Sequence, residues 1–148
     1  MAAGGMINAF TVDVEEWFHI CGVPELSDPG QWDALPSRIR DNTARVLALL
    51  DATGVRATFF VVGWVAERHP ELIESIRLAG HEIGSHSHLH RRVYDLDEAA
   101  FTSDLARARE LRPLYERADY LLDLHSMTDR CPPLAMAGRQ RKGVELAQ

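Results

Sequence analysis

The chain alternates short apolar segments with amphipathic ones, and this alternation limits its fold more than any other feature. Residues 7–14 and 56–63 are apolar and rich in β-branched side chains, and residues 81–85 are a shorter strand candidate. Between them, apolar residues recur at helical spacing from about 37 to Gly54 and from about 70 to Gly80. Strand and helix alternating through short connections predict an α/β fold with a parallel sheet.

The second half of the chain continues this pattern less regularly. A third helix is predicted after residues 81–85, with an N-cap at Asp95 and Glu98 three residues further on. Residues 120–125 form a fourth strand candidate. The length of 148 residues, with 46% hydrophobic and 26% charged residues, fits one globular domain.

Composition also excludes several classes of function. No apolar run approaches the roughly 20 residues of a membrane-spanning helix, so no membrane partner is expected. The formal net charge is −6 and no basic stripe occurs, which argues against nucleic acid as a partner. Residues 1–6 lack the basic and apolar regions of a secretory signal, so we expect a cytoplasmic protein.

Histidines cluster directly after the third strand. His86 and His90 are four residues apart, a spacing that on a helical turn points both imidazoles the same way. Imidazole is a good ligand for zinc and similar divalent ions, and a carboxylate from Asp13 or Glu15 could complete the site. Both acidic residues end the first strand, and parallel sheets place their sites at the carboxyl ends of strands. The pattern predicts a metal site suited to hydrolysis, with a second carboxylate accepting the proton of the attacking water.

Four segments occur in the order and spacing of one known enzyme family. They are residues 11–19 (TVDVEEWFH), 57–61 (ATFFV), 80–90 (GHEIGSHSHLH) and 93–96 (VYDL). On these segments, residues 7 to about 103 resemble the front half of a polysaccharide deacetylase of carbohydrate esterase family four. The resemblance implies part of a distorted parallel β/α barrel, removal of acetyl groups from an acetylated poly- or oligosaccharide, and a divalent metal, most commonly zinc.

Carried over by position, the resemblance assigns a role to each residue of the predicted site. Asp13 would be the general base, and Glu15, His86 and His90 would be the metal ligands. The commonest first motif of the family places the ligand directly after the base, whereas here Glu15 follows two residues later, as in a subgroup written Asp-Val-Glu. The family's third motif, a strand with Arg-x-Pro, has no counterpart in this sequence.

Residues from about 105 to 148 resemble a different family. The segments 108–114 (ARELRPL) and 118–127 (ADYLLDLHSM) are similar to an internal piece of the succinylglutamate desuccinylase/aspartoacylase family. In that family the histidine at the position of His125 is a zinc ligand, but the His-x-x-Glu that completes its ligand set is absent here. We therefore predict a chimera with its seam between Asp95 and Leu105. Residues 1–104 would form a deacetylase-like part, and residues 105–148 a helix–strand segment packed on the same sheet.

Three functions remain open from the sequence. The first is metal-dependent deacetylation of a carbohydrate, possible only if the shortened chain is active. The second is a non-catalytic metal-binding fragment, and the third is a zinc-dependent N-acyl amino acid amidohydrolase acting through His125. A separate hypothesis gives His125 the general-acid role of the deacetylases' late Leu-His motif. The open sheet edges of a partial barrel also predict self-association.

Overall fold

The computed structural model of the protein describes residues 9–111, 123–125 and 134–136. The helices and strands are, in chain order, β1 (Thr11–Val14), α1 (Ile39–Thr53), β2 (Thr58–Val61), α2 (Gly63–Arg68), α3 (Pro70–Leu78), β3 (Glu82–Ser85), α4 (Glu98–Glu110), β4 (Asp123–His125) and β5 (Leu134–Met136). Short 3-10 helices are η1 (Trp17–His19), η2 (Pro24–Leu26), η3 (Pro29–Ala34) and η4 (Val93–Asp95).

Strands β1, β2 and β3 form one parallel sheet in that order, as the alternation of strands and helices predicts. The register runs without a break from the row Thr11–Thr58–Glu82 to the row Val14–Val61–Ser85. All three strands therefore end at the same level of the sheet, and the residues that follow them start from one edge.

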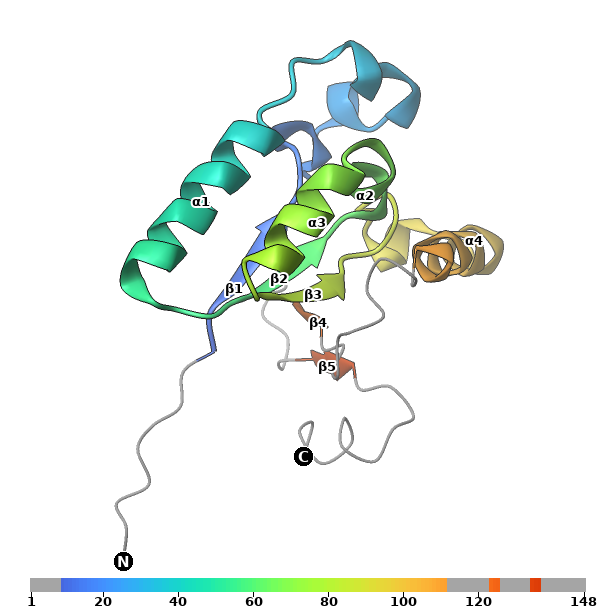
Figure 1. The fold of residues 1–148 in the computed structure, drawn as a ribbon. Coiled ribbons are helices and arrows are strands. Elements are labelled where there is room, and N and C mark those ends of the chain that lie inside the picture. The colour runs from blue at the N-terminus through green and yellow to red at the C-terminus, as the bar shows by residue number, and fades with distance from the viewer. Residues whose placement is uncertain (1–8, 112–122, 126–133, 137–148) are drawn as a thin grey trace, which may run out of the picture.

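Alternate residues of the sheet form the face that the helices cover. Phe59 and Val61 of β2 are fully buried, and Val14 and Ile83 from the neighbouring strands join the same cluster. The helices contribute Ile39 and Leu50 from α1 and Leu72, Ile73 and Ile76 from α3. Figure 1 shows α1 and α3 lying together over this side of the sheet. Each buried aliphatic or aromatic side chain stabilises the fold by roughly 1.5–3 kcal/mol.

The other face of the sheet is more polar. One row across it holds Asp13, Phe60 and Gly84. Two rows earlier, on the same face, Thr58 Oγ1 donates a hydrogen bond of 2.7 Å to Glu82 Oε2. Asp13 is exposed, while Phe60 is buried. This face leads to the carboxyl ends of the strands, where the predicted metal ligands begin.

The structure corrects the predicted end of the second strand. The prediction carried that strand to Gly63, but β2 ends at Val61 and a helix, α2, begins at Gly63. Val62, Trp64 and Val65 are all buried. A short apolar run of this kind is compatible with a buried strand and with a buried helix, so its periodicity could not separate the two.

The start of the third predicted helix is also corrected. Asp97, not Asp95, caps α4, because the Asp97 side chain accepts a hydrogen bond of 2.7 Å from the Ala100 N–H. Asp95 ends η4, and its Oδ2 lies 2.6 Å from Arg92 Nε. Two aspartates two residues apart offer equivalent cap signals, and the short 3-10 turn between the loop and the helix decides between them.

The predicted fourth strand is present as β4, but it pairs with β5 in an antiparallel two-stranded sheet. Helix α4 begins inside the predicted seam, at Glu98, and runs without a break through the 104/105 boundary. Most of residues 105–148 lies outside the described residues, so the chimera and the division into two segments stay predictions. Among the helices of the described residues, none has the length and apolar character to cross a bilayer.

Gly63 lies where the start of α2 closely approaches residues 86–90, and an added side chain would meet His88. A Cβ added there would lie 2.6 Å from His88 Nδ1 and 3.1 Å from His88 Cα. We expect Gly63→Ala to lower the free energy of unfolding by about 1–3 kcal/mol through overpacking, measured by urea denaturation.

Gly30→Ala is the matched control, because its added Cβ would meet only the Asp28 side chain, at 3.2 Å. We expect this control to change the free energy of unfolding by less than about 0.5 kcal/mol. Equal losses in the two variants would contradict the tight packing assigned to Gly63.

Candidate metal centre

The parallel register brings the first acidic segment and the first histidine to one edge of the sheet. Val14 and Ser85 lie in the last row of the sheet, with Val61 between them. Glu15 and His86 are the next residues on the two outer strands. The His86 N–H donates a 2.9 Å hydrogen bond to the Val61 carbonyl, so the ladder continues into the site.

Three predicted ligands meet at this edge. One ligand atom from each of Glu15, His86 and His90 lies within 4.8 Å of the other two. Glu15 Oε2 is 3.2 Å from His90 Nε2, and the two imidazole ring centroids are 4.7 Å apart. His86 is buried, and Glu15 and His90 are partly buried. The fold thus brings together Glu15 and His90, which are 75 residues apart in the sequence.

The hydrogen bonding of His90 makes this group suited to a cation. His90 Nδ1 lies 2.9 Å from the backbone carbonyl of His19, and a carbonyl only accepts, so Nδ1 carries a proton. In a neutral imidazole Nε2 then presents a lone pair toward Glu15 Oε2, which is buried without a hydrogen-bond donor. A cation between these two atoms, either the proton of a histidine–glutamate ion pair or a metal ion, stabilises the pair at 3.2 Å.

The spacing fits a small tetrahedral ion. Zinc bonds of about 2.0–2.2 Å to nitrogen and oxygen place neighbouring ligand atoms about 3.3–3.6 Å apart in a tetrahedron, slightly longer than the Glu15–His90 distance of 3.2 Å. Two imidazoles and one carboxylate leave a fourth position open, which is the usual arrangement of a catalytic zinc. Glu15, His86 and His90 are therefore the residues that could hold a divalent metal.

The histidine loop, residues 86–90, has a backbone that needs outside support. Ser87 and His90 have positive φ angles of 59° and 52°, which non-glycine residues seldom adopt. On one side, the N–H groups of Gly63 and Trp64 at the start of α2 donate to the carbonyls of Ser87 and His88, at 2.9 and 3.0 Å.

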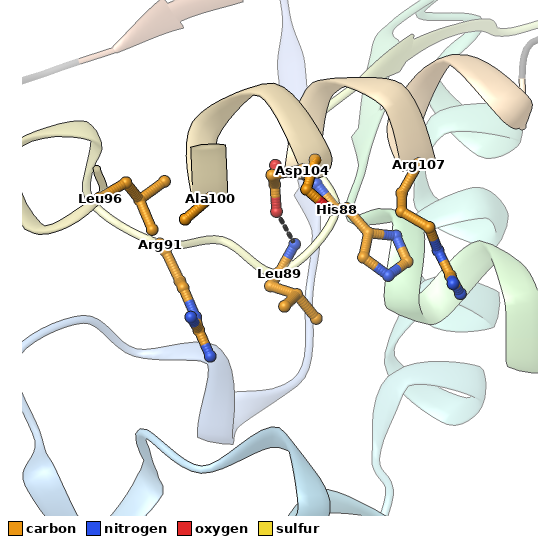
Figure 2. A pocket seen from close by; sticks show the side chains of 8 residues that line it. His88, Leu89, Arg91, Leu96, Ala100, Asp104 and Arg107 are labelled. Carbon is orange, nitrogen blue, oxygen red and sulfur yellow. Dashed lines mark hydrogen bonds between the residues drawn. The ribbon is translucent and has the colours of Figure 1, made fainter. Parts of the chain in front are cut away.

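Asp104 of α4 supports the loop from the other side. Its carboxylate accepts hydrogen bonds from the N–H groups of His88 and Leu89, at 2.9 and 3.0 Å. Figure 2 shows this carboxylate facing the loop above Leu89. Two charge-assisted bonds at adjacent peptide groups fix the backbone between the two predicted histidine ligands. The role of Asp104 was not predicted from the sequence, because no local pattern distinguishes it from other aspartates on helix surfaces.

His88 turns away from the metal group. It is buried beside Gly63 and lines a pocket of about 370 Å³ between the histidine loop and α4 (Figure 2). Burial lowers the pKa of His88 below its ordinary value, although the nearby Glu67 carboxylate opposes the shift. His88 therefore has a packing role, while the residues two positions before and after it face Glu15.

Asp13 and His125, the two predicted proton-transfer residues, are not among the three predicted ligands. Asp13 lies two residues before Glu15, on the same side of the strand, and is exposed; it is not one of the three clustered ligands. His125 ends β4, and the structure describes that strand but not the side chain. The base role of Asp13 and the acid role of His125 stay predictions.

Two buried polar residues beside the centre were given no role from the sequence alone. Glu16 and His19 flank the aromatic pair Trp17–Phe18, and both are almost completely buried. Burial, with further lowering by the neighbouring His90, Arg68 and His86, brings the pKa of His19 to about 3. A histidine inside an apolar, aromatic segment was the available signal, but its partners lie too far along the chain to be inferred locally.

The fold and the site together define an α/β protein with a carboxylate–histidine centre at the carboxyl edge of a parallel sheet. A model of one family, polysaccharide deacetylase, matches residues 31–116, which is more than half of the chain. The chain belongs to the polysaccharide deacetylase family. The matched range includes His86 and His90 and begins after Glu15.

Curated relatives with established names lie in the same family. The chain is 30% identical over 69 residues to a peptidoglycan-N-acetylglucosamine deacetylase of Bacillus cereus, covering 47% of this chain and 25% of that protein. It is 35% identical over 91 residues to a chitin deacetylase of Colletotrichum lindemuthianum, covering 53% and 37%. The chain thus spans between a quarter and two fifths of these relatives.

Solved structures confirm the fold class. A crystal structure assigned to the polysaccharide deacetylases, from Mycobacterium smegmatis, matches 73% of this chain and 39% of its own, with a TM-score of 0.57 and 36% identity. A peptidoglycan N-acetylglucosamine deacetylase matches 77% of this chain and 42% of its own, with a TM-score of 0.53 and 25% identity. The predicted partial β/α barrel of the polysaccharide deacetylase type is confirmed.

The contacts of Asp104 predict a specific loss of metal affinity. Asp104→Ala removes the acceptor for two loop N–H groups, so we expect the free energy of unfolding to fall by about 1.5–3 kcal/mol. Because the loop positions two ligands, zinc affinity should also fall, by about 10- to 100-fold. Urea denaturation and competition with a chromophoric chelator measure the two effects.

Asp97→Ala on the same helix is the control. It removes the α4 cap, which is worth about 1 kcal/mol, and the Asp97 carboxylate accepts its hydrogen bond from the Ala100 N–H of its own helix. We expect this variant to lose stability and to keep its zinc affinity. A parallel fall of zinc affinity in both variants would mean that affinity follows general stability instead of the Asp104 contacts.

Proposed function

We propose that this protein hydrolyses acetyl groups on an acetylated poly- or oligosaccharide, using a divalent metal, most simply zinc, held by Glu15, His86 and His90. The observation that carries the proposal is the grouping of one ligand atom each from Glu15, His86 and His90 within 4.8 Å of one another, with Glu15 Oε2 3.2 Å from His90 Nε2. Membership of the family and the names of the peptidoglycan and chitin deacetylases support the substrate class.

The bound metal would supply Lewis-acid activation of a water molecule and polarisation of the acetyl carbonyl. Glu15 and the two histidines would fix its position, and His19 would hold His90 in the tautomer that leaves Nε2 available. Asp13 lies two residues before Glu15 and therefore points to the same face of the strand. Its carboxylate would accept the proton of the attacking water. Its exposure on the open sheet face supports this role, because a base must reach solvent-borne water and substrate.

Deacetylation also needs a proton for the leaving amine or alcohol. His125 is our candidate for this general acid, supported by its position at the end of strand β4. Substitution of His125 by Ala in an active preparation tests the role: turnover at the wild-type rate would remove it.

We also propose the remaining properties that the sequence predicts. A cytoplasmic location, the lack of a membrane or nucleic-acid partner, and a chimeric origin rest on the sequence patterns alone. Self-association is supported by the sheet, because within the described residues β1 and β3 each pair with β2 alone. None of the comparisons supports an N-acyl amino acid amidohydrolase.

Metal content tests the ligand set. We expect the purified protein, after incubation with zinc and desalting, to hold about one zinc per chain by elemental analysis. The double variant His86→Ala/His90→Ala should hold none, since a lone carboxylate binds zinc weakly. A control variant with two other histidines replaced, His69→Ala/His81→Ala, should keep the metal. Zinc retained by the first double variant, or absent from the wild type, would contradict the assignment.

Asp13→Asn separates catalysis from metal binding. We expect this variant to bind zinc as the wild type does and to lose acetate release from an acetylated chito-oligosaccharide by about 10²- to 10⁴-fold, the usual contribution of a general base. Wild-type turnover in Asp13→Asn would exclude Asp13 as the base. A zinc-loaded wild type that releases no acetate would favour the alternative of a non-catalytic metal-binding protein.

A further inference from the structure

The short helix η1 follows the candidate ligand Glu15 and contacts the candidate ligand His90. Two hydrogen bonds between Glu16 and His19 close its turn. The Glu16 N–H donates to His19 Nδ1 at 3.1 Å, and the His19 N–H donates to the Glu16 carbonyl at 2.9 Å. Glu16 is 2% exposed and His19 is 3% exposed. The turn that follows Glu15 is therefore closed from both ends by two residues that are shielded from water.

The same turn orients the second ligand. The His19 backbone carbonyl accepts the hydrogen bond from His90 Nδ1, at 2.9 Å. This contact determines which His90 nitrogen carries the proton and which one faces Glu15. Partners of this kind commonly set the ring orientation of metal-binding histidines.

The turn is anchored to the body of the protein by the Glu16 carboxylate. Glu16 Oε1 and Oε2 both lie 3.1 Å from the Arg38 N, and Oε1 lies 3.2 Å from the Ile39 N. The Ser37 hydroxyl donates to Glu16 Oε1 as well. These donors stand at the start of α1, a 15-residue helix whose N-terminal end favours negative charge. The buried Glu16 carboxylate is thus stabilised by several donors at the start of a helix.

We propose that Glu16 and His19 are positioning residues of the metal centre, which place Glu15 and orient His90 by coupling both to the start of α1. The inference rests on the proposed function, since it concerns the same three ligands. Glu16 fixes the backbone one residue after Glu15, and His19 closes the turn whose carbonyl holds His90. Neither side chain is itself a ligand of the metal.

The chemistry of the His19 side chain predicts which substitution can replace it. Its Nδ1 accepts a hydrogen bond from Glu16, so the proton of the neutral ring lies on Nε2. Nε2 is buried with no hydrogen-bond partner in the described part of the chain, and the rings of Trp32 and Trp64 lie at centroid distances of 4.6 and 5.3 Å. The turn therefore needs only an acceptor bonded to Cγ. Asparagine offers one at that position, and glutamine carries its oxygen one bond further out.

The test compares His19→Asn with His19→Gln, two amides that differ in where the acceptor lies. Zinc affinity is measured by chelator competition, and the visible absorption of the cobalt-loaded protein reports the ligand geometry. We expect His19→Asn to bind zinc within about threefold of the wild type. His19→Gln should bind about 10- to 100-fold more weakly and show a weaker cobalt absorption. His19→Ala repeats the comparison if the glutamine variant fails to fold.

A merely structural role gives a different result. It would lower the urea midpoint of the metal-free variants while leaving the zinc affinity and cobalt spectrum of the folded protein unchanged. Equal zinc affinity in the wild type and His19→Gln, or equal losses in His19→Asn and His19→Gln, would overturn the positioning role alone. A wild type that binds no zinc would overturn the proposed function, and the positioning role with it.

Discussion

The unbroken parallel register of β1, β2 and β3 is the constraint on which the candidate site depends. Side chains alternate between the two faces of a strand, so a slip of one residue would move every side chain of a strand to the opposite face. Glu15 and His86 directly follow the last row of the sheet, and the apolar residues Phe59, Val61 and Ile83 fix the register from the helix-covered side. The hydrophobic pattern that forms the core thus also places the acidic and imidazole groups at one edge.

Backbone donors and acceptors complete what the register begins. His90 is not on a strand, and its loop has two residues with positive φ. Asp104 and the first N–H groups of α2 hold that loop, while the His19 carbonyl holds the His90 ring. Each of these contacts is modest in net free energy, about 1–3 kcal/mol for the charge-assisted ones. Together they keep Glu15 Oε2 and His90 Nε2 close enough to share a cation.

The sequence predicts the part of this architecture that arises from local patterns. The three strands, the helices between them and the grouping of Glu15, His86 and His90 follow from apolar periodicity, ligand spacing and the family resemblance. Helix α2 was missed because a short buried apolar run has no diagnostic period. The roles of Asp104 and Glu16 were missed because their partners lie 15–16 and 21–23 residues away in the chain, and no local pattern specifies such contacts.

The ligands of a bound metal are the central test of the candidate centre. X-ray absorption at the zinc edge of the zinc-loaded protein in solution measures them directly. We predict four nitrogen or oxygen atoms at about 2.0–2.1 Å, with the outer-shell scattering of two imidazole rings and none from sulfur. A zinc–sulfur distance near 2.3 Å, which would implicate a cysteine, or a spectrum without imidazole scattering would contradict the centre formed by Glu15, His86 and His90.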